Sequence, residues 1–357
     1  MGRIRIEGRD LYREWVSGYP IGCELCVEGD KTVIFITGVC HDNCFYCPIS
    51  VGRMGWDSIY VDEERVEDLE DVISYIEIVG GRGASITGGD PLIVIDKTSY
   101  IIRRLKESFG ERFHIHLYTS GRYADLGSLK ILERAGLDEI RFHPVDRRYL
   151  ERIRTAVRET SMSVGAEIPV IPGDEDRIRD LILYLESIGA EFINLNELEV
   201  SERNKEALMF RGFRISSDGI SVEGSRETAY KILRWARDQG LRIRVHFCSS
   251  KLKDAIQTMR RYRRIAMRVA LPHQKIGEDG ILSWIEISCG SRSRVVEKIL
   301  SGYEYYYRDG VYYVHPDINR DRVKELKKIC RVKLVERMPL VLGNVSRENL
   351  IENVYEL

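Results

Sequence analysis

The feature that most constrains the fold is an alternation of short apolar runs with amphipathic stretches between residue 31 and about residue 250. Such an alternation is typical of β/α units, in which helices connect parallel strands. Several of the amphipathic stretches end in glycine, the residue that helix C-caps favour. We expect seven strands, at residues 31–39, 83–89, 113–121, 138–144, 163–172, 191–199 and 241–249.

Five of the expected strands are polar on one face, which indicates a barrel. Successive strand residues point to opposite faces, and strands buried inside an open parallel sheet are apolar on both. Inward charged and amide groups need a cavity that satisfies them. We therefore predict an α/β chain with a partial (β/α)6-type barrel that holds polar substrates, although any one of these groups could instead belong to a buried structural network. The inward set is His114, His116, Tyr118, Arg141, His143, Glu167, Asn194, Asn196, Arg244, His246 and Cys248.

The two ends of the chain differ from this region. Residues 1–30 form an N-terminal segment with one C-x2-C pair, and residues 251–357 are expected to form a small α+β appendage. From residue 251 to residue 337 the appendage carries 20 Lys and Arg against 11 Asp and Glu. Its basic stretch at 260–268 is either a solvated helix face or a surface for a phosphate backbone. A tyrosine-rich stretch at 303–316, with Asp-Gly at its centre, predicts a hairpin.

Composition limits the setting in which the chain works. With 43% hydrophobic and 31% charged residues it has a globular composition, and 357 residues suffice for one large domain and a smaller one. No apolar run reaches the roughly 18 to 20 residues that cross a bilayer, and no signal-peptide core is visible. We expect a cytoplasmic protein without membrane contact. Scarce Gln with abundant Arg, Glu, Ile and Val fits a thermophile.

Cysteine spacing points to an iron–sulfur cluster. Five of the eight cysteines fall within 25 residues, and three of them, Cys40, Cys44 and Cys47, follow the first expected barrel strand with C-x3-C-x2-C spacing. Three thiolates in one short loop can bind three corners of a four-iron cluster and leave the fourth iron open. Zinc sites usually contain paired C-x2-C units that close a tetrahedron. We call residues 40–47 the triad loop and expect a [4Fe-4S] cluster there.

The triad loop resembles the cluster-binding motif of the radical S-adenosylmethionine (SAM) superfamily, including the aromatic residues Phe45 and Tyr46 before the last cysteine. The resemblance implies that the open iron chelates the amino and carboxylate groups of SAM. It also implies that one electron, from a reductant such as ferredoxin or flavodoxin, cleaves SAM to methionine and a 5'-deoxyadenosyl radical. That radical would abstract hydrogen from a substrate held in the barrel.

Other segments extend the resemblance over about residues 31–250. Gly88-Gly89-Asp90 ends the second expected strand, where the family carries a Gly-Gly-Glu type turn that contacts the methionine amine; here Asp replaces the Glu. Residues 117–121 resemble the third-strand segment bordering the cofactor, and residues 165–173 resemble the fifth-strand segment of pyruvate formate-lyase activating enzymes. By this resemblance the cofactor-binding residues are Tyr46, Gly88, Gly89, Asp90, Thr119, Ser120, Glu167 and Asn196.

The remaining cysteines suggest a second, auxiliary cluster. Cys23 and Cys26 lie in the N-terminal segment, which is long enough to cross the barrel mouth, and Cys248 points inward from the last polar strand. We expect these three thiolates to bind the auxiliary cluster, with unrelated buried thiols as the alternative. Cys289 and Cys330 are expected to be core cysteines, because cysteine behaves as a small buried hydrophobe.

The substrate is less constrained than the cofactor. Candidate substrate-binding residues are the inward groups His116, Arg141, His143, Arg244 and His246. The basic appendage favours modification of a macromolecule, either RNA such as tRNA or a polypeptide, whereas the 165–173 segment favours activation of a glycyl-radical enzyme. A small-molecule substrate is a further possibility. A cluster-carrying electron-transfer or scaffold protein without turnover is the alternative of a different class.

Overall fold

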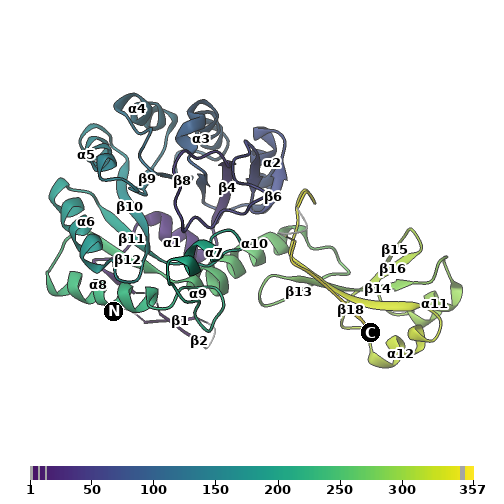
Figure 1. Ribbon diagram of the computed structural model, residues 1–357. Coiled ribbons are helices and arrows are strands. Elements are labelled where there is room, and N and C mark those ends of the chain that lie inside the picture. Colours follow the sequence, from purple (N-terminus) through teal and green to yellow (C-terminus); the bar gives the residue numbers. More distant parts are fainter. Residues whose placement is uncertain (1–2, 7–8, 13, 346–349) are drawn as a thin grey trace. The chain divides into compact units, whose positions relative to one another are not determined.

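The computed structural model describes residues 3–6, 9–12, 14–345 and 350–357, which divide into two compact units (Figure 1). Unit 1 consists of Met1–Ile73 with Gly81–Gln257, and unit 2 consists of Ser74–Gly80 with Thr258–Leu357. In the part of the chain so described, no helix is long and apolar enough to cross a membrane.

Unit 1 is built on one ten-stranded sheet with the order β3-β12-β11-β10-β9-β8-β7-β4-β5-β6. Its seven central strands are parallel and correspond to the seven expected strands. Short antiparallel strands, β3 at one edge and β5 and β6 at the other, end the path, so the barrel is open. The predicted α/β fold with a partial barrel is thereby confirmed. The strands are β3 (Glu14–Val16), β4 (Lys31–Thr37), β5 (Ile59–Val61), β6 (Glu64–Val66), β7 (Gly83–Gly88), β8 (His114–Thr119), β9 (Glu139–Phe142), β10 (Ser163–Val170), β11 (Phe192–Glu197) and β12 (Arg244–Cys248).

Six β/α connections join the parallel strands, with the helices arranged around the sheet (Figure 1). Their amphipathic sequences bury one stripe, and local signals mark their ends. The Asp125 carboxylate caps the start of α4, for example, by accepting the Ser128 N–H, and Gly136 ends this helix with a φ of 97°. The connecting helices are α2 (Leu69–Val79), α3 (Ile95–Phe109), α4 (Leu126–Ala135), α5 (Leu150–Glu159), α6 (Glu175–Ile188) and α8 (Ser225–Asp238).

The strand faces divide as the alternation predicts. On β8, Ile115 and Leu117 are fully buried among apolar groups, whereas His116 Nε2 lies 3.2 Å from the Tyr118 hydroxyl. On β9, Ile140 and Phe142 belong to the apolar core, and Arg141 between them bonds to polar groups of the barrel interior. The interior of the barrel, which we call the lumen, is therefore lined by polar side chains.

The N-terminal segment enters the lumen instead of crossing its mouth. Helix α1 (Ile21–Glu28) contacts β4 and β8, and the Gly22 N–H donates to the carboxylate of Glu139, the first residue of β9, over 3.3 Å. Because the parallel strands begin at the same edge of the sheet, α1 lies toward the end opposite the triad loop. A Cβ atom at Gly22 would come within 2.8 Å of polar atoms of Arg141, His116 and Glu139, so any larger residue would displace these buried side chains. The expected position at the mouth is wrong, because length sets how far a segment reaches and not its direction.

Unit 2 is a small antiparallel sheet of order β15-β16-β14-β17-β18, with β13 beside β14. The predicted hairpin is formed by β15 and β16, which turn at Asp309 and Gly310, both with positive φ. The core of unit 2 includes Ile287, Tyr312 and Leu326. Its elements are α10 (Met259–Val269), β13 (Lys275–Ile276), β14 (Leu282–Ser288), α11 (Arg294–Ile299), β15 (Tyr305–Arg308), β16 (Val311–Val314), α12 (Arg320–Lys327), β17 (Arg331–Arg337) and β18 (Glu352–Glu356).

Cys289 and Cys330 form a disulfide in unit 2, with their Cα atoms 4.8 Å apart. The expectation that they are separate core cysteines is wrong. Ser288 and Arg331 are paired across β14 and β17, so the residue after one and the residue before the other meet at the end of this strand pair. Neither cysteine can then supply a ligand to an auxiliary cluster.

We expect the disulfide to stabilise unit 2, because it closes a loop in the unfolded chain between residues 41 positions apart. Loop-closure entropy puts the contribution at about 4 kcal/mol. The Cys289→Ser/Cys330→Ser variant should unfold unit 2 at a lower temperature in calorimetry. Wild type in excess reductant is the matched control and should behave like the variant. Equal unfolding temperatures for the oxidised wild type and the variant would contradict the prediction.

Candidate functional site

The triad loop leaves β4 at the C-terminal edge of the barrel. Cys40, Cys44 and Cys47 are all free and partly exposed. The Cys47 N–H donates to the Cys44 carbonyl over 3.1 Å, and the Asp42 N–H donates to the Cys40 sulfur over 3.5 Å. These two local hydrogen bonds form turns within the triad loop, which carries all three thiols.

The donor set of the triad loop fits an iron–sulfur cluster. Within the described ranges, no group of three or more His, Cys, Asp and Glu side chains converges on a single metal ion. The thiolates of a zinc site all lie about 2.3 Å from one centre. The thiolates of a four-iron cluster bind different irons and so stand further apart. Three free thiols from one loop would supply three ligands to such a cluster.

The Gly88-Gly89-Asp90 turn packs directly against the start of the triad loop. The Gly89 N–H donates to the Thr37 carbonyl over 2.7 Å, and the Asp90 N–H donates to the Val39 carbonyl over 2.9 Å. A Cβ atom at Gly88 would lie 2.2 Å from the Thr37 oxygen, and one at Gly89 would lie 2.1 Å from the Val39 oxygen. Only glycine permits this approach of the two backbones. The turn therefore supports the segment that carries the first cysteine.

Asp90 ties this turn to the end of β8. Its buried carboxylate accepts hydrogen bonds from Thr119 Oγ1 (3.0 Å), from Ser120 Oγ (2.7 Å) and from the Ser120 and Leu92 N–H groups. Burial outweighs these donors and raises the pKa of Asp90. The structure thus brings three predicted cofactor-binding residues together, and their polar groups bond to one another.

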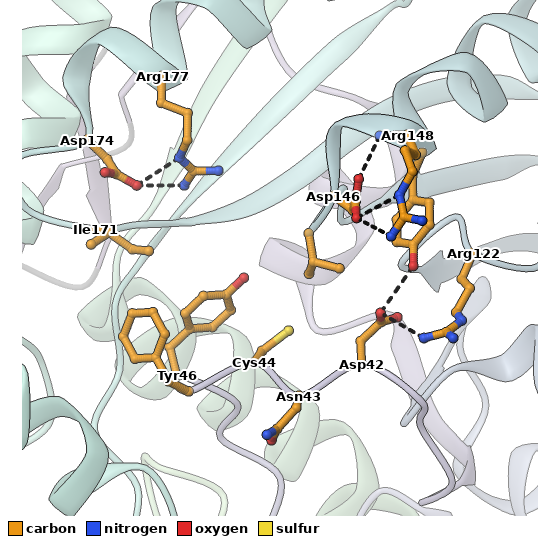
Figure 2. Close-up of a pocket in the computed structure, with 13 residues that line it drawn as sticks. Asp42, Asn43, Cys44, Tyr46, Arg122, Asp146, Arg148, Ile171, Asp174 and Arg177 are labelled. Carbon is orange, nitrogen blue, oxygen red and sulfur yellow. Dashed lines mark hydrogen bonds and ion pairs between the residues drawn. The ribbon is translucent and has the colours of Figure 1, made fainter.

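A cavity of about 480 Å³ opens beside Cys44, between the loops that follow β4, β8, β9 and β10 (Figure 2). Three arginine–aspartate pairs line it, and Cys44 points into the space between them (Figure 2). Sequence reasoning missed these six residues, although each follows an expected strand closely, and the loops after barrel strands commonly carry function. The pairs are Arg122–Asp42 (3.6 Å), Arg148–Asp146 (2.6 Å) and Arg177–Asp174 (2.8 Å).

Arg141 links the middle of the lumen. Its guanidinium donates to Glu139 over 2.5 Å and to Glu167 over 2.8 Å. Glu167 also accepts from the Asn194 amide at 3.0 Å and from the Asn196 amide at 2.8 Å. Burial alone would raise the pKa of Glu167, but Arg141 and the two amides outweigh it and the pKa is lowered. Glu167 is therefore held as a carboxylate.

Lys31 occupies the N-terminal end of the lumen. Its ammonium group donates to His114 Nδ1 (2.8 Å), His116 Nδ1 (2.9 Å) and the Ala84 carbonyl (2.9 Å). Burial lowers the pKa of Lys31 to about 8, and burial together with the Lys31 charge lowers that of His114 to about 3. Both imidazoles are neutral and accept hydrogen bonds from Lys31. His116 is therefore bonded to protein groups at the end of the lumen away from the cavity.

The other predicted substrate-binding residues are dispersed. His143 lies at the mouth of the lumen, with its Nε2 atom 2.9 Å from the Tyr46 hydroxyl. His246 is fully buried beside the Tyr19 ring. The predicted inward position of Arg244 is wrong: this first residue of β12 has a side chain that is 42% exposed and lies 3.5 Å from Glu191, outside the lumen.

Cys23, Cys26 and Cys248 face the same lumen. The Cys23 sulfur accepts a hydrogen bond from the Asn194 amide over 3.2 Å, and the Cys248 sulfur accepts one from Gln257 over 3.6 Å. Burial raises the pKa of Cys23 and Cys248, that of Cys248 to about 12, and the Cys26 sulfur acts electrostatically on both. Cys23 and Cys248 are thus buried, whereas Cys26 is partly exposed and lies within electrostatic reach of both.

The Arg141 ion pairs predict a large effect on stability. Arg141→Met would leave two buried carboxylates without their cation, which typically costs about 3–5 kcal/mol. Arg244→Met is the matched control and should cost under about 1 kcal/mol, because the pair it breaks is solvated. Urea unfolding of both variants measures the difference. A similar loss in both would show that the lumen pair does not carry the stability assigned to it.

Comparisons with known proteins point to one superfamily. The sequence profile of the Radical SAM superfamily matches residues 34–164. A protein of Methanocaldococcus jannaschii, provisionally described as a glycyl-radical enzyme activating enzyme, is 39% identical over 274 residues, which are 74% of this chain and 72% of that protein.

Solved structures with a similar arrangement include SuiB of Streptococcus suis bound to SAM, with a TM-score of 0.44 and 10% identity over 62% of this chain and 50% of that chain. Another is the radical S-adenosylmethionine methyltransferase TsrM of Kitasatospora setae, with a TM-score of 0.38 and 13% identity over 72% of this chain and 56% of that chain. The chain spans about half the length of these solved proteins.

Proposed function

Since this chain belongs to the radical SAM superfamily and is an enzyme of that type, we propose that Cys40, Cys44 and Cys47 hold its [4Fe-4S] cluster and that its substrate is a polypeptide. When bound, the cluster and SAM supply a 5'-deoxyadenosyl radical that abstracts hydrogen. The observation that carries the proposal is the position of Cys44 on the cavity at the C-terminal edge of the barrel. A cofactor on the triad loop and a substrate in this cavity would be adjacent.

The chain's own residues hold and orient the reactants. Gly88 and Gly89 bring their turn against the backbone of Thr37 and Val39, and Asp90 fixes the turn by bonding to Thr119 and Ser120. In the proposal, this turn would hold the methionine part of SAM. Glu167 and Asn196, which are bonded to each other below the mouth, and Tyr46 complete the proposed cofactor-binding set. The polar lumen keeps these groups in fixed geometry while SAM and substrate exchange.

The charge of the cavity favours a polypeptide over RNA. Its lining contains three arginines and three aspartates, each arginine near an aspartate, so no excess positive charge faces a ligand. Binding of a phosphate backbone depends on excess Lys and Arg. The M. jannaschii relative, described provisionally as an activating enzyme of glycyl-radical enzymes, supports the same substrate class. We propose activation of a glycyl-radical enzyme as the specific form.

We further propose that Cys23, Cys26 and Cys248 bind an auxiliary cluster within the lumen. The support is that Cys23 and Cys248 are buried and that the partly exposed Cys26 interacts electrostatically with both. Such a cluster would lie inside the lumen near Arg141, whose charge acts on Cys23 and Cys26, and not at the cavity. Its thiols must lose their protons on binding metal, since burial keeps them protonated otherwise.

Cofactor cleavage tests the triad. With dithionite and SAM, the reconstituted wild type should form 5'-deoxyadenosine, and the Cys40→Ala/Cys44→Ala/Cys47→Ala variant should form none above background. The Cys289→Ser/Cys330→Ser variant is the control with altered cysteines outside unit 1 and should retain cleavage. Wild-type levels of 5'-deoxyadenosine from the triad variant would refute the assignment. No product from an iron-loaded wild type would favour a scaffold without turnover.

Iron counting tests the auxiliary cluster. The reconstituted wild type should contain about eight irons per chain, and Cys23→Ala/Cys26→Ala should contain about four, because each cluster carries four. Sulfide analysis and low-temperature electron paramagnetic resonance provide the independent measurements. About four irons in both proteins would leave the triad as the sole cluster site and would exclude the second.

Isotope transfer tests the substrate class. A glycyl-radical enzyme from the same genome, expressed with deuterated glycine, should transfer deuterium into 5'-deoxyadenosine when incubated with the reconstituted enzyme and SAM. The unlabelled protein is the control, and total tRNA is the competing substrate. Deuterium-free product that increases with tRNA and not with the protein would favour RNA modification.

A further inference from the structure

The connection from β11 to α8 packs against the triad loop. We call residues 199–213 of this connection the β11–α8 segment; it contains the short helix α7 (Lys205–Phe210). Its contacts fall on residues 45–47, the part of the triad loop that follows Cys44 and ends with Cys47. The segment therefore touches the loop at the stretch between its last two cysteines.

Asn204 joins three backbone groups through one side chain. Its amide nitrogen donates to the Tyr46 carbonyl over 2.9 Å and to the Glu199 carbonyl over 2.9 Å. Its Oδ1 atom accepts from the Ser201 N–H over 2.7 Å, and only 1% of the residue is exposed. The two carbonyls can only accept, so this orientation of the amide is the one that pairs every donor with an acceptor. The amide thereby fixes the Tyr46 carbonyl.

The ring of Phe45 is held by the same segment. It stacks on Phe213, with the ring centroids 6.3 Å apart and the ring planes 2° from parallel, and the Arg211 guanidinium lies over it at 4.3 Å from the centroid. Phe45 and Tyr46 also pack on a buried apolar cluster that contains Leu208. Aromatic stacking and cation–π contact both favour this position of the ring. Both side chains between the last two cysteines are thus anchored outside the triad loop.

Arg203 extends these contacts to the last cysteine, because its guanidinium donates to the Cys47 carbonyl over 3.4 Å. Three consecutive residues of the triad loop are therefore held from one segment, Phe45 by its ring and the next two by their carbonyls. The backbone that separates the Cys44 and Cys47 sulfurs is fixed by groups that lie outside the loop.

We propose that the β11–α8 segment, chiefly through Asn204, positions the triad loop for its cluster by holding the backbone between Cys44 and Cys47 in the conformation that presents both sulfurs. The inference rests on the proposed assignment of the triad. A loop that is ordered beforehand loses less conformational freedom when it binds metal. Replacing a group that supports metal ligands in this way typically weakens metal binding by about 10- to 100-fold. Asn204 is therefore a positioning residue.

Asn204→Leu tests this role, because leucine is close in size and makes none of the three hydrogen bonds. Iron should then be lost to a chelator about tenfold faster. Ser225→Ala is the matched control. Ser225 is fully buried at the far end of the same connection, and its hydroxyl joins the Val170 carbonyl (2.8 Å) at the end of β10 to the Leu198 N–H (2.9 Å) after β11. This control should lose iron at the rate of its parent.

The measurement is the rate of iron release to an excess of chelator at a temperature well below unfolding. All proteins carry Cys23→Ala/Cys26→Ala, so that the iron reports on the triad. Calorimetry of the iron-free proteins measures the fold itself, and both Asn204→Leu and Ser225→Ala should unfold at a lower temperature, since each leaves buried backbone groups without a partner. A role in folding alone would speed iron loss in both variants, whereas positioning speeds it only in Asn204→Leu.

Iron release from Asn204→Leu at the parent rate, or an equal acceleration in Ser225→Ala, would overturn the inference. If Asn204→Leu does not fold, Arg203→Met decides, because it removes the bond to the Cys47 carbonyl from a partly exposed side chain. Faster iron loss from that variant supports the inference, and the parent rate refutes it.

Failure of the triad assignment has a different signature. A parent protein that holds no iron, or one that keeps its iron after Cys40→Ala/Cys44→Ala/Cys47→Ala, would overturn that assignment and this inference with it.

Discussion

Arg141 lies inside the barrel with 2% of its side chain exposed and pairs with two carboxylates, Glu139 toward the start of the strands and Glu167 toward their ends. A buried guanidinium without partners would be prohibitive, and the same holds for the two carboxylates. Each charged group therefore requires the others. The amides of Asn194 and Asn196 donate to the carboxylate oxygens of Glu167 and complete its hydrogen bonding. This arrangement explains why the lumen is lined by polar side chains. It also explains why helix α1 has a glycine, Gly22, where it contacts these charged groups.

The network connects the two ends of the barrel physically. At one end, Lys31 bonds to the neutral imidazoles of His114 and His116. At the other end, the Glu167 carbonyl receives the Nδ1 hydrogen of His143, whose Nε2 accepts the Tyr46 hydroxyl of the triad loop. The triad loop is thus supported by a series of hydrogen bonds that starts in the middle of the lumen. Its geometry therefore depends on Arg141, which lies deeper in the lumen than the loop itself.

Local periodicity made much of this predictable. The polar faces of β8 and β9 follow from the two-residue repeat of strands, and the triad follows from three cysteines in one short loop. Non-local features left no such signal. The Cys289–Cys330 disulfide depends on the register of β14 with β17, and the entry of α1 from the opposite end depends on contacts with Glu139. The spacing of residues in the sequence predicts neither the disulfide nor the position of α1.

The charged cavity belongs to the same class of unpredicted features, and the reason is instructive. Arg122, Arg148 and Arg177 lie in three different connections that follow β8, β9 and β10, Arg177 in the first turn of α6, and each is ordinary in its own sequence context. Only the barrel brings them to one edge, where an aspartate lies beside each of them. A surface with matched opposite charges discriminates by geometry and not by net charge. The proposed preference for a peptide segment, which has its own amide donors and acceptors, over a polyanion rests on this property.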